Sequence, residues 1–229
     1  MRKLLRAAML LLAVLMAACT APDTWELVSK DNNIRFVLAN KKDKGEVNLC
    51  YSVYYRDTLA VEKSLLGLVM DNCEYGKDAQ FVSASAVKDI SNAYQLKSGK
   101  KLNTTDECRE QIFTFRNKEN KQFNLIARVY NDGVAFRYEL PGEAAQMHPI
   151  QTEHTEFAVP VNGKAWIHPY DWNDRHKPSY EQYCRSEIDI RSECGHGRGW
   201  AFPMLFNTNG IWMMITEAHL NGSYPATHI

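Results

Sequence analysis

The 229-residue sequence lacks an excess of charge of either sign, because 27 lysine and arginine residues balance 27 aspartate and glutamate residues. A balanced chain has no field to attract nucleic acid or an anionic membrane surface, so the sequence predicts neither as an electrostatic partner. It also lacks any stretch of helical length with sustained apolar periodicity, any internal repeat and any low-complexity tract. These absences exclude a helical bundle and a repeat array.

An apolar run long enough to span a bilayer is missing too. The run near the N-terminus, Ala7–Ala18, is shorter than the roughly 20 residues that a transmembrane helix needs. It follows the basic residues Arg2, Lys3 and Arg6, and small residues lead directly into Cys19, as in a bacterial lipobox. We therefore expect residues 1–18 to be a lipoprotein signal peptide and residues 19–23 a short tether. Lipidated Cys19 would then anchor the exported protein to a membrane, in the periplasm or at the outer membrane. An ordinary signal peptide cleaved near the same place is the alternative.

The closely paired cysteines of a zinc knuckle are absent as well, which disfavours zinc at Cys184, Cys194 and His196. Without Cys19, an odd number of cysteines remains, so at least one thiol is unpaired within the chain. An exported protein permits disulfides, and Cys184 and Cys194 are close enough in sequence to staple one loop. Both a disulfide and free thiols stay open for the remaining cysteines, which are Cys50, Cys73, Cys108, Cys184 and Cys194.

What the sequence has in abundance is two-residue alternation of apolar and polar side chains. This pattern is typical of strands with one buried face, and many short strands indicate an antiparallel sandwich or barrel, an all-β fold. Residues 71–108 are the exception, because they are polar and weakly patterned. We predict strands over Ile34–Leu38, Val47–Tyr55, Gln111–Arg116, Phe123–Tyr130, Val134–Leu140, Thr155–Val159, Ala165–Ile167 and Ile211–Thr216, with turns at Lys118–Lys121 and Asn207–Gly210.

The clearest local signal is a β-hairpin. Two alternating runs, ending at Tyr130 and beginning at Val134, flank Asn131-Asp132-Gly133. Asp-Gly between such runs is a strong hairpin signal, because glycine accepts the positive φ that many tight turns need. We expect residues 131–133 to form the tip, Phe136 and Tyr138 to share a face, and one side of that strand to be buried.

Residues His168–Trp200 are rich in aromatic, histidine and carboxylate side chains and poor in strand pattern. Loops of this length within compact domains tend to be functional or disordered. Aromatic rings here are of the kind that stack on sugar rings, although single ones also close the end of a sandwich. We interpret the loop as a functional interface. Its aromatic residues, with Trp166 just before it, are Trp166, Tyr170, Trp172, Tyr180, Tyr183 and Trp200.

The order of several short segments resembles the N-terminal domain of glycoside hydrolase family 97, the bacterial α-glucosidases and α-galactosidases. The similarity covers residues 24–229 and implies a large two-sheet β-sandwich akin to galactose mutarotase, with the catalytic (β/α)₈ barrel absent from the chain. The segments are Ser64-Leu65-Leu66-Gly67-Leu68, Asn131–Pro141, Thr155-Glu156-Phe157, Ala165–Tyr170, Met214–Leu220 and Tyr224-Pro225.

The resemblance also implies a metal site. In the family, the N-terminal domain lends a glutamate to an active-site calcium, and Ser179-Tyr180-Glu181-Gln182-Tyr183 matches the segment that carries it. The resemblance therefore implies that Glu181 is a calcium ligand, whereas sequence alone would make it an exposed loop residue. Glu217 is a second candidate, and Trp172, Tyr180, Tyr183 and Glu217 are candidates for contact with substrate or barrel. His176 and Glu187 could complete an acid–base group with Glu181, but no spacing rule selects them.

We expect the chain to be a non-catalytic, carbohydrate-binding and active-site-shaping domain of an exported exo-α-glycosidase, inactive alone because the family's catalytic carboxylates lie in the barrel. The alternative is a free-standing exported lipoprotein that binds glycan or protein. An in-frame barrel in the downstream nucleotide sequence would favour the first, and a genuine stop the second. Whether the parent retains or inverts, and whether it acts on glucosides or galactosides, stays open.

Overall fold

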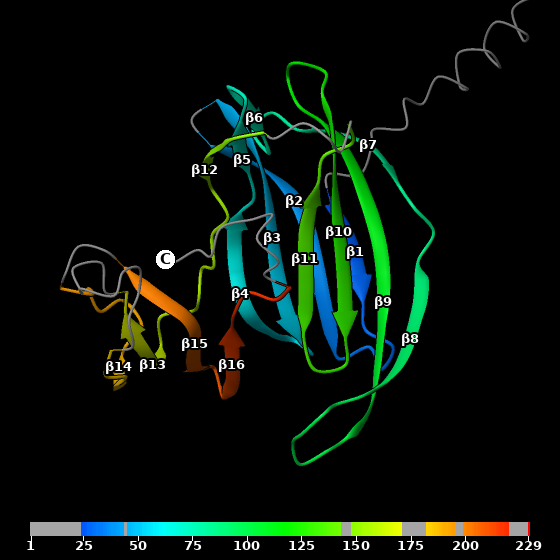
Figure 1. The fold of residues 1–229 in the computed structure, drawn as a ribbon. Coiled ribbons are helices and arrows are strands. Elements are labelled where there is room, and N and C mark those ends of the chain that lie inside the picture. Colours follow the sequence, from blue (N-terminus) through cyan, green and yellow to red (C-terminus); the bar gives the residue numbers. More distant parts are fainter. Residues whose placement is uncertain (1–23, 44, 143–147, 171–181, 196–198, 220–228) are drawn as a thin grey trace, which may run out of the picture.

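The computed structural model describes residues 24–43, 45–142, 148–170, 182–195, 199–219 and 229 (Figure 1). These residues form antiparallel β-strands, and no helix occurs among them. Consequently, the described part of the chain contains no helix that is long and apolar enough to cross a membrane. The all-β prediction is confirmed.

Two sheets make the body of the molecule. One has the order β1 (Thr24–Val28), β2 (Ile34–Asp43), β3 (Glu46–Tyr55), β4 (Thr58–Leu65), a simple meander. The other has the order β11 (Val134–Glu139), β10 (Gln122–Tyr130), β9 (Asn103–Arg116), and the far edge of β9 pairs in turn with β7 (Gln80–Ala84) and β8 (Lys88–Gln95). In Figure 1 the blue strands of the first sheet lie behind the green strands of the second.

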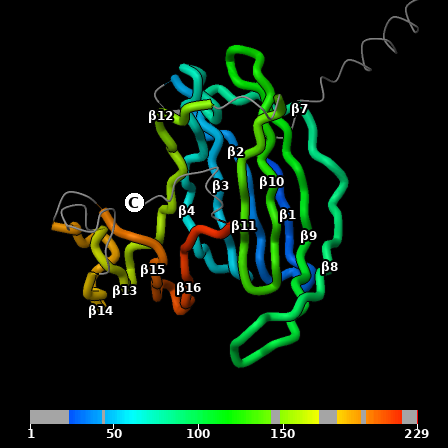
Figure 2. The backbone as a smooth tube through the Cα atoms, in the orientation of Figure 1, coloured from blue at the N-terminus to red at the C-terminus, as the bar shows by residue number. Residues whose placement is uncertain are grey.

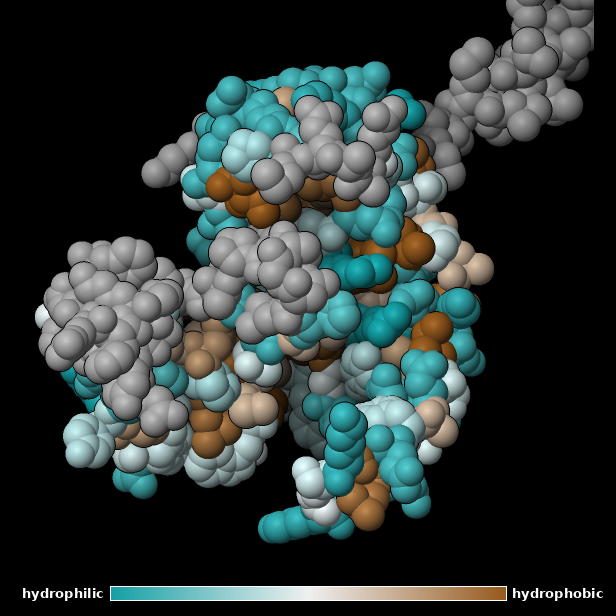
Figure 3. Space-filling view, in the orientation of Figure 1, coloured by the Kyte–Doolittle hydropathy of each residue, from teal (hydrophilic) through white to brown (hydrophobic). Residues whose placement is uncertain are grey.

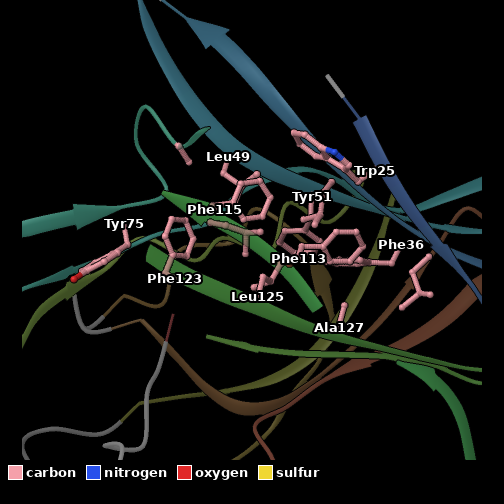
Figure 4. Close-up of a cluster of buried hydrophobic side chains, with 14 of the residues drawn as sticks. Trp25, Phe36, Leu49, Tyr51, Tyr75, Phe113, Phe115, Phe123, Leu125 and Ala127 are labelled. Atoms are coloured by element: carbon pink, nitrogen blue, oxygen red, sulfur yellow. The ribbon is translucent and has the colours of Figure 1, made fainter. Parts of the chain in front are cut away.

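A single aromatic core joins these sheets into a sandwich. Alternate residues of β2 and β3, such as Phe36 and Tyr51, face alternate residues of β9 and β10, such as Phe115 and Phe123. Phe115 stacks on Phe123 with ring centroids 5.6 Å apart and meets Trp25 of β1 edge-on at 5.4 Å. Figure 4 shows these rings between the two layers of strands. The predicted antiparallel β-sandwich is therefore confirmed for the body of the domain.

The predicted hairpin is confirmed. β10 pairs with β11 from Asn124–Glu139 to Val129–Val134, and the Tyr130 amide donates to the Gly133 carbonyl at 2.8 Å across the tip. Phe136 and Tyr138 share the face that packs on the core. The reason given for Gly133 is wrong, because its φ is not positive. The three-residue connection between the strands closes without a left-handed residue.

Two smaller sheets lie beside the body. The sequence predicted strands within β13 and β16 but did not predict these sheets as separate layers. One is β12 (Ile150–Glu153), β5 (Leu68–Met70), β6 (Cys73–Tyr75), whose strands are too short to show a pattern. The other, called here the small sheet, has the order β14 (Arg185–Asp189), β13 (Gly163–Pro169), β15 (Trp200–Thr208), β16 (Ile211–Ile215). It stands to one side of the sandwich in Figure 2 and has its own core, made of Val159, Ala165, Ile167, Met204, Phe206 and Ile215.

The prediction of a strand at Thr155–Val159 is wrong, because these residues form no strand in the structure. These residues pair only intermittently with β4, through the Glu156 amide to the Leu65 carbonyl at 3.0 Å and the Glu62 amide to the Ala158 carbonyl at 2.7 Å. The buried Tyr138 hydroxyl accepts from the Gly67 amide and shares a 2.9 Å hydrogen bond with Thr155. The segment is thus held to the body largely by side chains. The turn predicted at Asn207–Gly210 begins two residues later, because β15 runs to Thr208.

All five described cysteines are free thiols. Of the two alternatives that the sequence left open, a disulfide or free thiols, the structure therefore shows free thiols. Cys184 is exposed, and Cys50, Cys73, Cys108 and Cys194 are buried. Burial raises the pKa of the Cys50 and Cys108 thiols, which further reduces their thiolate fraction at neutral pH.

We expect one rapidly reacting thiol in a Cys19→Ala chain treated with a thiol-specific reagent near neutral pH. Only Cys184 combines exposure with access for the reagent, whereas the four other described thiols are shielded. Mass spectrometry of the labelled peptides measures the order of modification, and denaturant should release all five. Equally fast labelling of Cys50 or Cys108 would contradict the packing described here.

Candidate functional site

The small sheet brings the two ends of the long aromatic loop together. Ile167 of β13 lies opposite Arg185 of β14, and Pro169 lies opposite Trp200 of β15. Residues 170–184 therefore connect neighbouring strands at one end of the sheet. β16 runs toward the same end, because Ile215 lies opposite Met204. Glu217 follows two residues after the end of β16.

A set of backbone and cation–π contacts fixes the base of this loop. The Arg185 guanidinium lies 5.2 Å from the ring centroid of Trp200 and donates to the Cys194 carbonyl at 3.0 Å. The Tyr170 amide donates to the Gly199 carbonyl at 3.0 Å, and Trp200 pairs through its backbone with Ile229. A guanidinium against an aromatic face adds electrostatic attraction to the packing. The loop accordingly begins and ends on a rigid frame.

The predicted site residues divide into two groups. Glu181, Trp172 and Tyr180 lie outside the described residues, as do Cys19 and His176. Tyr183 is described and is 94% exposed, so it does not close the end of the sandwich. Glu217 is partly buried and has an interaction partner, and Glu187 is exposed on β14. Among the described residues, neither Glu187 nor Glu217 belongs to a group of three or more possible metal ligands.

Among the described residues, no group of three or more histidine, cysteine, aspartate or glutamate side chains is arranged to hold a metal ion. Of the soft-ligand candidates, Cys184 is exposed and Cys194 is buried, while His196 lies outside the described residues.

A cavity of about 330 Å³ lies on the inner face of the small sheet. Most of its walls are aliphatic and aromatic, and its ionisable side chains are Glu62 and Arg191. Glycoside hydrolysis needs two carboxyl groups that flank the scissile bond. This cavity has one, so its described walls do not form a hydrolytic site. The residues that line it are Glu62, Phe157, Ala158, Val159, Val161, Ile167, Ile190, Arg191, Trp200, Met204, Phe206, Ile215 and Ile229.

The outer face of the small sheet carries a feature that the sequence reasoning missed. Trp212 and Met214 of β16 are 61% and 62% exposed, and Trp212 lies against Trp166 of β13 with ring centroids 4.8 Å apart. Exposed apolar patches of this kind mark interaction surfaces. The available signal was the wholly apolar run Ile211–Ile215, which has too little alternation to tell the exposed face from the buried one.

Comparison with known proteins assigns the family. The family described as "Glycosyl-hydrolase 97 N-terminal" matches residues 27–229. A curated relative from Streptomyces bingchenggensis (strain BCW-1), named "Probable retaining alpha-galactosidase", is 26% identical over 74% of this chain and 25% of its own length. A solved β-arabinopyranosidase is 26% identical, with a TM-score of 0.79 over 89% of this chain and 33% of its own.

Two further structures, of a glycoside hydrolase family 97 enzyme from Pseudoalteromonas sp. strain K8 in complexes with panose and with acarbose, share the fold. Each is 20% identical, with a TM-score of 0.65 over 81% of this chain and 27% of its own length. The chain thus spans between a quarter and a third of the length of these relatives. The match over residues 27–229 makes the chain a member of glycoside hydrolase family 97, corresponding to its N-terminal domain.

Proposed function

We propose that the chain is the non-catalytic, active-site-shaping domain of an exported exo-α-glycosidase that acts in glycan breakdown on α-glucosides or α-galactosides. The observation that carries the proposal is the family match over residues 27–229. The relatives are glycosidases by name, and one of them was solved with panose and with acarbose. Because the chain spans a quarter to a third of their length, we assign catalysis to a barrel outside it.

The domain's role in this proposal is to present the loop of residues 170–184 to the barrel. Arg185 and Trp200 would hold the loop's base, while Glu181 would supply a carboxylate to a calcium ion shared with the barrel. Calcium prefers oxygen ligands, typically about 6–8 of them, and one carboxylate supplies at most about two. The donor atoms of this part of the chain suit calcium in their chemistry, because Glu217 after β16 offers a second carboxylate while the thiol of Cys194 is buried. Bound calcium would fix the substrate and polarise its oxygen atoms.

Replacing Glu181 by glutamine tests this role. In a barrel-containing parent we expect calcium affinity to fall about tenfold or more, because a ligating anion becomes a neutral amide. Hydrolysis of a nitrophenyl α-glycoside should fall with it. Calorimetry with calcium measures the first effect. A matched Glu193→Gln variant, at an exposed residue beside Cys194 at the loop base, should change neither.

The isolated chain should bind calcium weakly or not at all and should not hydrolyse the glycoside. Tight binding by the isolated chain would make the site local rather than shared, and unchanged calcium affinity in the Glu181→Gln parent would move the role to another residue, with Glu217 next.

The proposed export route has its own test. Replacing Cys19 by alanine should shift the protein from the membrane to the soluble periplasmic fraction, because lipid chains on Cys19 are the proposed anchor. Cell fractionation followed by immunoblotting measures the shift, and Cys184→Ala, at an exposed thiol, is the control. Membrane association that survives the Cys19 change would reject the lipid anchor.

A further inference from the structure

The strand register of the small sheet places two rows of side chains on its outer face. Directly opposed residues of antiparallel strands point to the same face, as do residues two apart along a strand. The first row crosses the whole sheet through Asp189, Lys164, Asn207 and Trp212. The second row, displaced by two residues along each strand, consists of Trp166, Leu205 and Met214. The residues between them, Ala165 and Phe206, are buried on the inner face, which confirms the assignment.

The two rows differ in chemistry. The second row is apolar, whereas the first offers a carboxylate, an ammonium group and an amide before it reaches Trp212. Lys164 and Asp189 are both exposed and form a 2.6 Å ion pair. Within the described chain, the Asn207 side chain takes part in no hydrogen bond, and it lies opposite Trp212. Hydrogen-bonding groups therefore line one side of an exposed indole.

Trp166 supports Trp212 from one side. Their rings are 4.8 Å apart and inclined by 39°, so Trp166 limits the rotation of Trp212 while most of the Trp212 indole stays in contact with solvent. An exposed tryptophan held by a second one is a preorganised stacking surface. Apolar residues at the surface of the small sheet are visible in Figure 3.

We propose that this face binds a neutral oligosaccharide, with the Trp212 ring stacked on the C–H face of a sugar and Asn207, Lys164 and Asp189 in contact with its hydroxyl groups. Charge complementarity favours this ligand, because Lys164 and Asp189 cancel and leave the face without a net charge. Hydroxyl groups accept from an ammonium and donate to a carboxylate, so one sugar satisfies both. A nucleic acid or an acidic partner would require uncompensated cations.

The choice of an α-linked glucose oligosaccharide as the ligand rests on the proposed function. The Lys164–Asn207–Trp212 row lies toward the turn between Thr208 and Ile211, away from the strand ends at which the aromatic loop begins and ends. A second glycan contact of this kind would hold a polymeric substrate near the enzyme. We expect weak binding, with a Kd on the order of 1 mM, because a single stacked ring buries little area.

Affinity electrophoresis of the chain in gels with soluble starch, and calorimetry with panose, test the proposal. Wild type should be retarded by starch, and Trp212→Ala should weaken binding of both probes about tenfold or more, equivalent to the loss of a stacked ring. Trp212→Phe should retain part of the affinity because it keeps an aromatic face. Tyr94→Ala removes a similarly exposed ring from β8 and should have no effect. Thermal unfolding checks that each variant is folded.

Absence of binding by the folded wild-type chain, or equal binding by Trp212→Ala, would overturn the proposal. The proposal would also be overturned if Trp212→Ala lowered the thermal midpoint of a barrel-containing parent but left glycan binding by the isolated chain unchanged. That result would identify the face as an interdomain contact. Glycan binding that depends on Trp212 would support the proposal whatever the result for Glu181. If Glu181→Gln left the calcium affinity of the parent unchanged, only the calcium role of Glu181 would be rejected.

Discussion

Replacing Phe115 by alanine should lower the free energy of unfolding by about 3–5 kcal/mol, the range for removal of a fully buried phenyl ring. Phe115 has no exposed surface and touches rings from both sheets of the sandwich. Its partners are Trp25 at 5.4 Å, Phe81 at 5.8 Å and Phe123 at 5.6 Å between ring centroids. The cavity would open at the centre of the core, where neighbours anchored on two sheets cannot both collapse into it.

Urea unfolding followed by circular dichroism measures this loss. The matched control is Tyr94→Ala on β8, because it also removes an aromatic ring but from a side chain that is 49% exposed. Surface changes of that kind usually stay within about 0.5 kcal/mol. A loss below about 1 kcal/mol for Phe115→Ala would mean that the two sheets are not packed through this ring.

Replacing Gly76 by alanine should destabilise the domain by about 2–5 kcal/mol, through backbone strain and a clash together. Gly76 has φ +105°, which side chains rarely adopt, and an added Cβ would lie 2.2 Å from the Leu66 carbonyl oxygen and 2.8 Å from Gly67 Cα. The Gly76 carbonyl accepts a 2.8 Å hydrogen bond from the Leu49 amide, so the backbone cannot easily withdraw.

Gly45→Ala separates the two causes. Gly45 also has a positive φ, +89°, but an added Cβ would meet nothing within 4 Å, so only the backbone term remains. We expect it to cost about 1 kcal/mol, by the same unfolding measurement. An equal loss of unfolding free energy in both variants would show that the backbone around Leu66 shifts to accommodate the added Cβ without a further cost.

The sequence predicted those parts of the fold in which a strand has clear apolar–polar alternation and pairs with its neighbour in sequence. The β10–β11 hairpin is the clearest example, since its strands are neighbours in sequence and one face of each is buried. The sequence did not predict β8 and the first part of β9. Both faces of that hairpin are largely exposed, so its apolar and polar residues need not alternate. The sequence also did not predict β13 to β16 as a separate layer. Alternation shows which side of a strand is buried but not which sheet buries it.

The candidate site was predicted less completely, for two physical reasons. Glu181 carries no local signal of its own, since a loop glutamate looks the same whether it binds solvent or an ion, and only the family resemblance selected it. Trp212 was hidden because β16 is apolar on both faces. An exposed face that is apolar resembles a buried one in sequence, so the surface rows became apparent only through the register with β15.

The order of strands along the chain also bears on how the protein is made. The sandwich draws on residues from Trp25 to Tyr138, whereas the small sheet and its core draw mainly on residues from Val159 to Ile215. Chains fold in units as they emerge, N-terminal units first. The sandwich is thus a template that exists before the small sheet is complete, and the strands that carry both the aromatic loop and the tryptophan pair assemble after it, against a surface that is already formed.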